Sequence, residues 1–88
     1  MVKRNPNAVI TQILEICSDG ANKTRVVYQA NLNSVIGNRY LDTLTKNGLI
    51  EAIPDGCRFI YKTTPMGKEL LERLGQFQGM MDELYSHA

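Results

Sequence analysis

The hydrophobic positions of the first half of the chain follow helical spacing. In the first predicted helix, apolar residues recur every three or four positions between an Asn5-Pro6 start and an Asp19-Gly20 stop. Asparagine followed by proline is typical of a helix N-terminus, because the asparagine side chain caps a free backbone N–H group and proline has no N–H that would lack a partner. The apolar positions of this helix are Val9, Ile10, Ile13, Leu14, Ile16 and Cys17.

Two further helices are predicted in quick succession. The second covers residues 23–30, and a link of three residues, 31–33, separates it from the third. The third covers residues 34–47, with Asn33 as its capping residue and Asn47-Gly48 as its stop signal. Two helices joined by so short a turn are typical of a helix-turn-helix.

From residue 49 the pattern changes from helical spacing to that of strands. Residues 49–53 and 57–62 are predicted as two strands, with a turn at Pro54-Asp55-Gly56 between them. In the second strand, Cys57, Phe59 and Tyr61 alternate with Arg58, Ile60 and Lys62. The sequence therefore predicts a β-hairpin directly after the third helix.

A fourth helix is predicted from Thr64-Pro65 to about Tyr85, by the same logic of a capping residue followed by proline. Its apolar residues Leu70, Leu74, Phe77, Met81 and Leu84 are separated by 4, 3, 4 and 3 positions, which is the spacing of a heptad seam. We expect Leu70 and Leu71 to pack on their own domain. The residues beyond them either pack on their own domain as well or pair with a second copy of the chain, and we favour the pairing. The predicted dimer interface is Leu74, Phe77, Met81 and Leu84.

The order of these elements is that of a winged helix. The predicted fold class is α+β, mainly α, with three helices, a β-hairpin wing and a long C-terminal dimerisation helix. We expect a winged helix-turn-helix domain over residues 1–63 and a dimerisation helix over residues 64–88. In such a fold, the third helix (34–47) enters the major groove of DNA, and the wing (54–57) lies on the backbone or minor groove.

A helical wheel of the third helix separates a core face from an outward face. With Tyr40, Leu41 and Leu44 inward, Asn38 and Arg39 point outward. Asparagine pairs with adenine and arginine with guanine, while a helix N-terminus suits a phosphate. Asp42 on the same face counts against tight DNA contact, and each basic residue alone would be an ordinary surface group. The predicted DNA contacts are Lys23, Arg25, Asn33, Ser34, Asn38, Arg39, Arg58 and Lys62.

Charge is distributed unevenly along the 88 residues, although the net charge is only +1. Residues 1–62 hold eight Lys and Arg against five Asp and Glu, a balance of +3, and residues 63–88 hold two against four, a balance of −2. The first part is therefore the candidate for an anionic partner, although its charge is well below that of a strongly basic DNA-binding domain.

Residues capable of catalysis or metal binding are few. Cys17 and Cys57 lie forty positions apart without metal-ligand spacing, so we expect two small core residues and no metal site. The only histidine, His87, is next to the C-terminus, and no nucleophile–base pair or phosphate-binding loop is evident. We therefore expect that the protein is not an enzyme and that it binds no cofactor and no small-molecule ligand. Without an apolar run or signal peptide, we also expect no membrane association and a cytoplasmic, nucleoid-associated location.

Three glycines lie within predicted helices, where glycine costs about 1 kcal/mol relative to alanine. At Gly37, either a neighbouring helix or a DNA phosphate approaches closely, and we favour the helix. Gly75 and Gly79 are expected to weaken the fourth helix.

The segment KTRVVYQANLNSVIGNRYLDTLTKNGLIE (23–51), followed by the wing and TTPMGKELL (63–71), resembles the archaeal winged-helix family that includes small crenarchaeal chromatin proteins. This resemblance implies binding of double-stranded DNA through the third helix and wing. It also implies a homodimer through an antiparallel coiled coil of the fourth helix. Because the chain is less basic than a bulk DNA packager, we favour a transcriptional regulator. The alternatives are a non-specific chromatin-associated protein and a winged-helix protein–protein interaction module.

Overall fold

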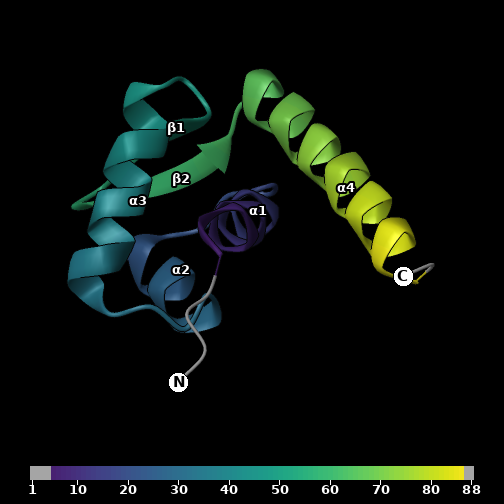
Figure 1. Ribbon diagram of the computed structural model, residues 1–88. Coiled ribbons are helices and arrows are strands. Elements are labelled where there is room, and N and C mark those ends of the chain that lie inside the picture. The colour runs from purple at the N-terminus through teal and green to yellow at the C-terminus, as the bar shows by residue number, and fades with distance from the viewer. Residues whose placement is uncertain (1–4, 87–88) are drawn as a thin grey trace.

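Figure 1 shows the computed structural model, which describes residues 5–86. His87, considered above, lies outside this range. The elements are α1 Pro6–Ile16, α2 Lys23–Gln29, α3 Ser34–Lys46, β1 Ile50–Asp55, β2 Arg58–Thr63 and α4 Pro65–Ser86. This is the predicted order, and the winged-helix fold class with a long C-terminal helix is confirmed.

Asparagine side chains fix the starts of the first three helices. The Oδ1 atoms of Asn5, Asn22 and Asn33 each accept a hydrogen bond of 2.8 Å from a backbone N–H in the first turn. The caps at Asn5 and Asn33 were predicted, whereas the cap at Asn22 was not. An N-cap asparagine contributes about 1 kcal/mol of stability, so each helix boundary is set by its own local sequence.

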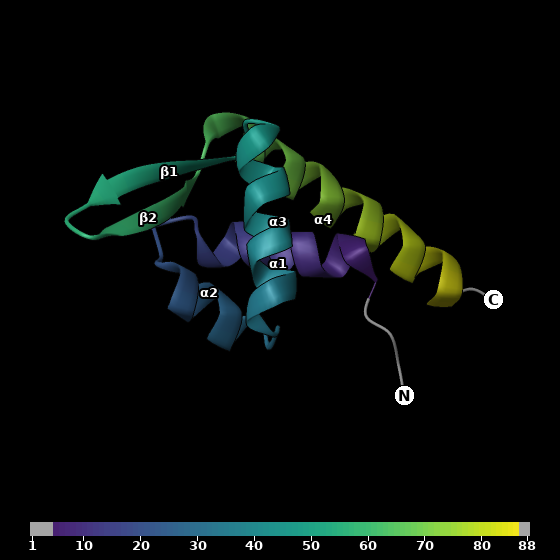
Figure 2. The ribbon, with the colours of Figure 1, turned by 90° about the vertical axis from the view of Figure 1, so that its left-hand side faces the viewer.

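The first three helices and β1 enclose the hydrophobic core. In Figure 2, α3 crosses α1, and the hairpin projects away on the side opposite the far end of α4. The buried apolar residues are Val9, Ile13, Leu14, Cys17, Ala21, Val26, Ala30, Leu41, Leu44 and Ile50. The predicted inward faces of α1 and α3 are therefore confirmed, with Tyr40 half-buried at the edge of the core.

Gly37 marks the closest approach of α2 and α3. It is buried, and a Cβ atom placed on it would lie 2.6 Å from Cγ2 of Val27. Real Cβ atoms essentially never come so close. The packing explanation for Gly37 is thus confirmed, and no phosphate is needed to account for this glycine.

The hairpin is longer than predicted, and its turn lies further along the chain. The strands pair antiparallel from Ile50↔Thr63 to Asp55↔Arg58, so the turn is Gly56-Cys57 and not Pro54-Asp55-Gly56. Proline is tolerated within β1 because both strands of a two-stranded sheet are edge strands. The φ of Gly56 is +63°, as a two-residue hairpin turn with glycine first requires.

A pair of backbone hydrogen bonds attaches the hairpin to the helices. Ala21 N donates to Tyr61 O at 2.9 Å, and Tyr61 N donates to Ala21 O at 2.8 Å. The sequence analysis missed this bridge, because the segment before α2 is too short to read as a strand. The bridge positions β2 beside the start of α2, which determines where the wing lies.

The start of α4 is packed tightly against the end of α3. Thr64 Oγ1 accepts a hydrogen bond from Gly67 N at 3.0 Å and donates one to Gly48 O at 2.6 Å, so the predicted cap is confirmed. Leu70 and Leu71 pack on the core, also as predicted. No helix within residues 5–86 is both long and apolar enough to span a membrane.

The far end of α4 exposes apolar side chains. Figures 1 and 2 show this helix extending past the body of the domain. Phe77 is 52% exposed and Leu84 is 65% exposed, while Leu74 and Met81 are half-buried. The single chain therefore leaves much of the predicted seam in contact with water.

The two cysteines occupy opposite environments. Cys17 is fully buried, as predicted, but the prediction of a core position for Cys57 is wrong. Because the turn includes Cys57, this residue lies at the exposed tip of the wing. Burial raises the pKa of the Cys17 thiol from 9.0 to about 11, against a smaller lowering by the charge of Arg25.

We therefore expect a maleimide at pH 7 to label Cys57 rapidly and Cys17 only after denaturation, because the thiolate is the reacting form. Mass spectrometry would count one adduct on the folded chain and two on the unfolded chain, and Cys57→Ser should abolish the first. Rapid labelling of folded Cys57→Ser would contradict the buried position of Cys17.

The raised pKa of Cys17 also makes the stability of the fold depend on pH. Above pH 9 the unfolded chain loses the thiol proton of Cys17, which the folded chain keeps until about pH 11. Ionisation of Cys17 should therefore lower the free energy of unfolding as pH rises across this interval.

Candidate nucleic-acid interface

The outward face of α3 is the first part of the candidate interface. Its predicted members Ser34, Asn38, Arg39 and Asp42 are all exposed, as is Val35 on the same face. The first turn of α3 carries no acidic residue, so the partial positive charge of the helix N-terminus is not offset there. This end of the helix is therefore suited to an anionic partner.

Asn33 and Ser34 lie at that N-terminus in different roles. The Oδ1 atom of Asn33 is occupied by the cap on Ile36 N at 2.8 Å. Ser34 borders a shallow hollow between α2 and α3, together with Lys23 and Tyr28. The structure thus brings one hydroxyl and one predicted basic contact together beside the helix start.

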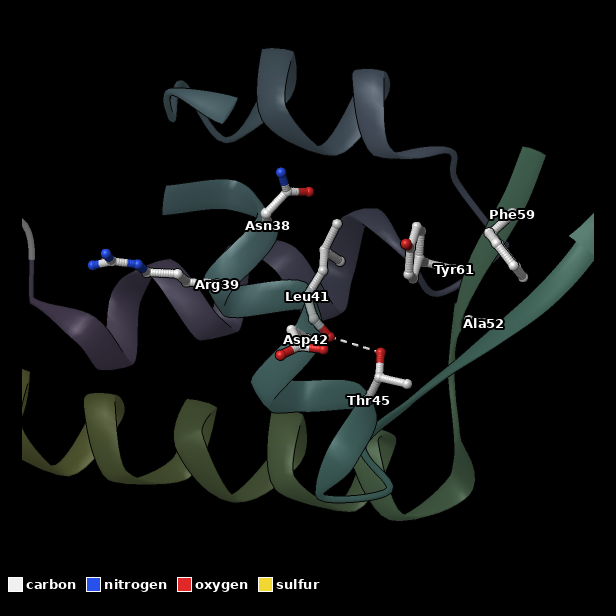
Figure 3. Close-up of a pocket in the computed structure, with 8 residues that line it drawn as sticks. All are labelled: Asn38, Arg39, Leu41, Asp42, Thr45, Ala52, Phe59 and Tyr61. Atoms are coloured by element: carbon white, nitrogen blue, oxygen red, sulfur yellow. Dashed lines mark hydrogen bonds between the residues drawn. The ribbon is translucent and has the colours of Figure 1, made fainter. Parts of the chain in front are cut away.

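A hollow of about 490 Å³ separates α3 from the hairpin, and we call it the α3–wing hollow (Figure 3). In Figure 3, Asn38 points to the side of α3 that faces α2, whereas the guanidinium of Arg39 extends away from the hairpin. The two predicted base contacts therefore diverge across the exposed face. The lining residues are Asn38, Arg39, Leu41, Asp42, Thr45, Ala52, Phe59 and Tyr61.

A second hollow, of about 770 Å³, lies between α2 and the hairpin, and we call it the α2–wing hollow. It contains three of the predicted basic contacts, from two separate elements. The lining residues are Asn22, Lys23, Thr24, Arg25, Tyr28, Arg58, Phe59 and Tyr61. Phe59 and Tyr61 border both hollows, so the wing strand forms the wall between them.

The acid on the outward face of α3 has a partner. Asp42 Oδ2 lies 3.1 Å from Nζ of Lys46, and both side chains are exposed. Such a surface ion pair contributes little to stability. Its effect on the interface is local, because the carboxylate is balanced on the C-terminal half of the helix, away from the N-terminal turn.

Lys62 does not join the other predicted contacts. It lines neither the α2–wing hollow nor the α3–wing hollow, and it pairs in register with Glu51. The two-residue period of β2 places Arg58 and Lys62 on the same face of the strand. Arg58, next to the turn, still borders the α2–wing hollow, whereas Lys62, four residues further from the turn, does not. Lys23, Arg25 and Arg58 therefore share one hollow, and Lys62 lies apart from them.

Aromatic residues at the interface were missed by the sequence analysis. Phe59 and Tyr61 are on the strand face that borders the hollows, and Tyr28 is an exposed residue of α2. The alternation in β2 already grouped the first two on one face, and this is the signal that could have found them. No such signal exists for Tyr28, which resembles any other helix residue.

Among residues 5–86, no cluster of three or more His, Cys, Asp or Glu side chains is arranged to hold a metal ion. What the described surface offers instead is hydrogen-bond donors, positive charge and aromatic rings around two open hollows.

Comparison with known sequences places this geometry in context. The sequence model of the winged helix-turn-helix family matches residues 3–82. The uncharacterised protein MJ0287 of the archaeon Methanocaldococcus jannaschii is 33% identical over 81 residues, which cover 91% of this chain and 79% of that protein.

Solved structures with the same fold include two from Sulfolobus solfataricus. The crystal structure of Sso10a-2, described as a DNA-binding protein, is 33% identical, with a TM-score of 0.89 over 96% of this chain and 88% of that chain. The transcriptional regulator BldR has a TM-score of 0.79 but is 19% identical, and the match covers 92% of this chain and 62% of BldR. The likeness to BldR therefore concerns the fold alone.

Proposed function

This chain belongs to the winged helix-turn-helix family, and from that premise we propose that it is a transcriptional regulator that binds duplex DNA as a homodimer. The observation that carries the proposal is the exposed N-terminal half of α3, which presents polar side chains and no acid in its first turn. The 33% identity to Sso10a-2, described as DNA-binding, supports it.

In the proposed complex, α3 lies in the major groove with its N-terminal half towards the bases. Asn38 donates to and accepts from adenine, and Arg39 donates to guanine. Ser34 and Lys23 contact phosphates on one side. Arg58 brings the wing to the backbone, so the base contacts of α3 are held in register.

The proposed dimer forms through α4, so that residues 1–63 bind DNA and residues 64–88 associate. Support comes from the apolar side chains that the single chain leaves exposed at Phe77 and Leu84. Exposed apolar stripes are typical of interaction surfaces. A symmetric pair of winged helices would bind two half-sites of a palindromic operator.

The remaining parts of the proposal follow from this function. A regulator of this kind needs no catalytic group and no cofactor, and it works where the DNA is, in the cytoplasm on the nucleoid. Steep loss of DNA affinity with rising salt would distinguish it from a protein–protein interaction module, because phosphate contacts release counterions.

The test replaces both proposed base contacts, as Asn38→Ala/Arg39→Ala. Duplexes selected by the parent protein from a random pool should be bound about 10- to 100-fold more weakly by this variant, with less preference over random duplex. Fluorescence anisotropy across a salt series measures both effects. Lys68→Ala is the matched control, because it removes one positive charge from an exposed position of α4.

Two outcomes would count against the proposal. Equal weakening on every duplex would show that Asn38 and Arg39 contact only phosphates. Failure of the parent protein to bind any duplex at low salt would reject DNA binding itself.

A further inference from the structure

Two aromatic rings at the α2–wing hollow are far more exposed than packing requires. Tyr28 is 84% exposed and Phe59 is 52% exposed, and both border this hollow. Neither ring belongs to the hydrophobic core, and neither is among the proposed duplex contacts. Exposed rings grouped around one hollow suggest a surface that binds a flat, apolar group.

The charged residues that line the α2–wing hollow are all positive. The hollow is lined by Lys23, Arg25 and Arg58, and no acidic residue borders it. Asp55 pairs in register with Arg58 on the neighbouring strand but does not line the hollow. A partner for this surface therefore combines negative charge with flat rings.

The hollow is held in place by the backbone. The two hydrogen bonds between Ala21 and Tyr61 join its two walls, α2 and β2. Its volume of about 770 Å³ is within the range of small-ligand sites, about 300–1,000 Å³. Figure 2 shows the hairpin and the far end of α4 at opposite ends of the molecule, so pairing of that end with a second copy leaves the hollow open.

Nucleotides combine flat rings with negative charge, but a duplex hides the faces of its bases. Only unpaired nucleotides present those faces, and proteins bind them by stacking bases on aromatic side chains beside a basic groove. We propose that the α2–wing hollow binds unpaired nucleotides of single-stranded nucleic acid. Bases stack on Phe59 and Tyr28, and Lys23, Arg25 and Arg58 contact the phosphates.

This activity goes beyond the proposed duplex readout, because Tyr28 and Phe59 are not among the proposed duplex contacts. Lys23 and Arg58 would contact phosphates in both complexes. Single-strand binding would let the protein hold a locally melted strand or a transcript. Both sources share the same chemistry of stacked bases and phosphates, and a DNA arm and an RNA arm of one experiment separate them.

The experiment measures anisotropy of labelled single-stranded 20-mers of thymidine and of uridine, with a 20-base-pair duplex alongside. Tyr28→Ser/Phe59→Ser should weaken binding of the single strands about 10-fold or more, because stacking on each ring is lost. Binding of the duplex should change less than about 3-fold. Tyr28→Phe/Phe59→Tyr keeps both rings and should retain single-strand binding, which separates stacking from any general effect on folding.

The base-contact variant Asn38→Ala/Arg39→Ala provides the reciprocal arm. It should lose duplex preference and keep single-strand binding. If the parent protein binds single strands but no duplex, the proposed function fails and this inference stands. The inference is overturned if the parent protein binds no single strand at low salt. It is also overturned if removal of the two rings weakens binding of the duplex and of the single strands equally, or weakens neither. Binding of only one of the two 20-mers assigns the source as DNA or RNA.

Discussion

Replacing Gly67 with alanine is expected to destabilise the fold by about 3 kcal/mol, near the upper end of the usual cost of overpacking. A Cβ atom at Gly67 would collide with the backbone oxygen of Leu49 and would lie 2.7 Å from Cγ2 of Thr63. The first neighbour is main chain and cannot rotate away. The junction between α3, β1 and α4 would have to open, and the cap from Thr64 to Gly67 N would be lost with it.

The same substitution at Gly79 is the matched control, because it lies in the same helix but nothing lies within 4 Å of its added Cβ. There alanine should stabilise the protein by up to about 1 kcal/mol through helix propensity alone. Urea unfolding followed by circular dichroism measures both values. Equal effects of the two substitutions would contradict the close approach at Gly67.

Charging the exposed part of the seam is expected to abolish the proposed dimer. In Phe77→Glu/Leu84→Glu, two apolar side chains per chain, each at least half exposed in the single chain, become carboxylates. Burial of such a side chain contributes about 1.5–3 kcal/mol, so the dissociation constant should rise at least about 100-fold. Sedimentation equilibrium measures it directly.

The control adds the same charge outside the seam, as Gln76→Glu/Ser86→Glu, at two exposed positions of α4. This control variant should associate as the parent protein does, with unchanged helix content. A monomeric parent would refute the dimer, and a dimeric Phe77→Glu/Leu84→Glu variant would place the interface elsewhere. Loss of the dimer should also weaken binding to palindromic DNA, because the second half-site would no longer be bound within the same complex.

The helices could be predicted because their signals are local. The caps at Asn5 and Asn33 and the prolines that follow Asn5 and Thr64 determine boundaries from a few adjacent residues. The position of Gly37 could be interpreted because a glycine inside an amphipathic helix has few explanations. For the caps, the physical cause lies within one turn of the residue concerned, whereas for Gly37 it is the contact with Val27 of the neighbouring helix.

The features that were missed depend on strand pairing and on contacts between segments. The turn was misplaced because Pro54-Asp55-Gly56 has the composition of a turn. In the structure Asp55 pairs with Arg58, so Pro54 and Asp55 belong to β1 and the turn begins at Gly56. That shift of the turn also exposes Cys57. The aromatic residues between the two hollows could not be predicted without knowing which face of β2 is turned towards the helices. The bridge between Ala21 and Tyr61 fixes that orientation.

That bridge has a consequence for how relatives can diverge. It is made entirely by main-chain atoms, so it survives any exchange of the exposed side chains on the wing, such as Arg58, Phe59 and Lys62. The placement of the wing is thereby inherited independently of the chemistry that the wing displays. The exposed residues of the wing can therefore be substituted one at a time during evolution, while the main-chain contacts that position the wing are kept.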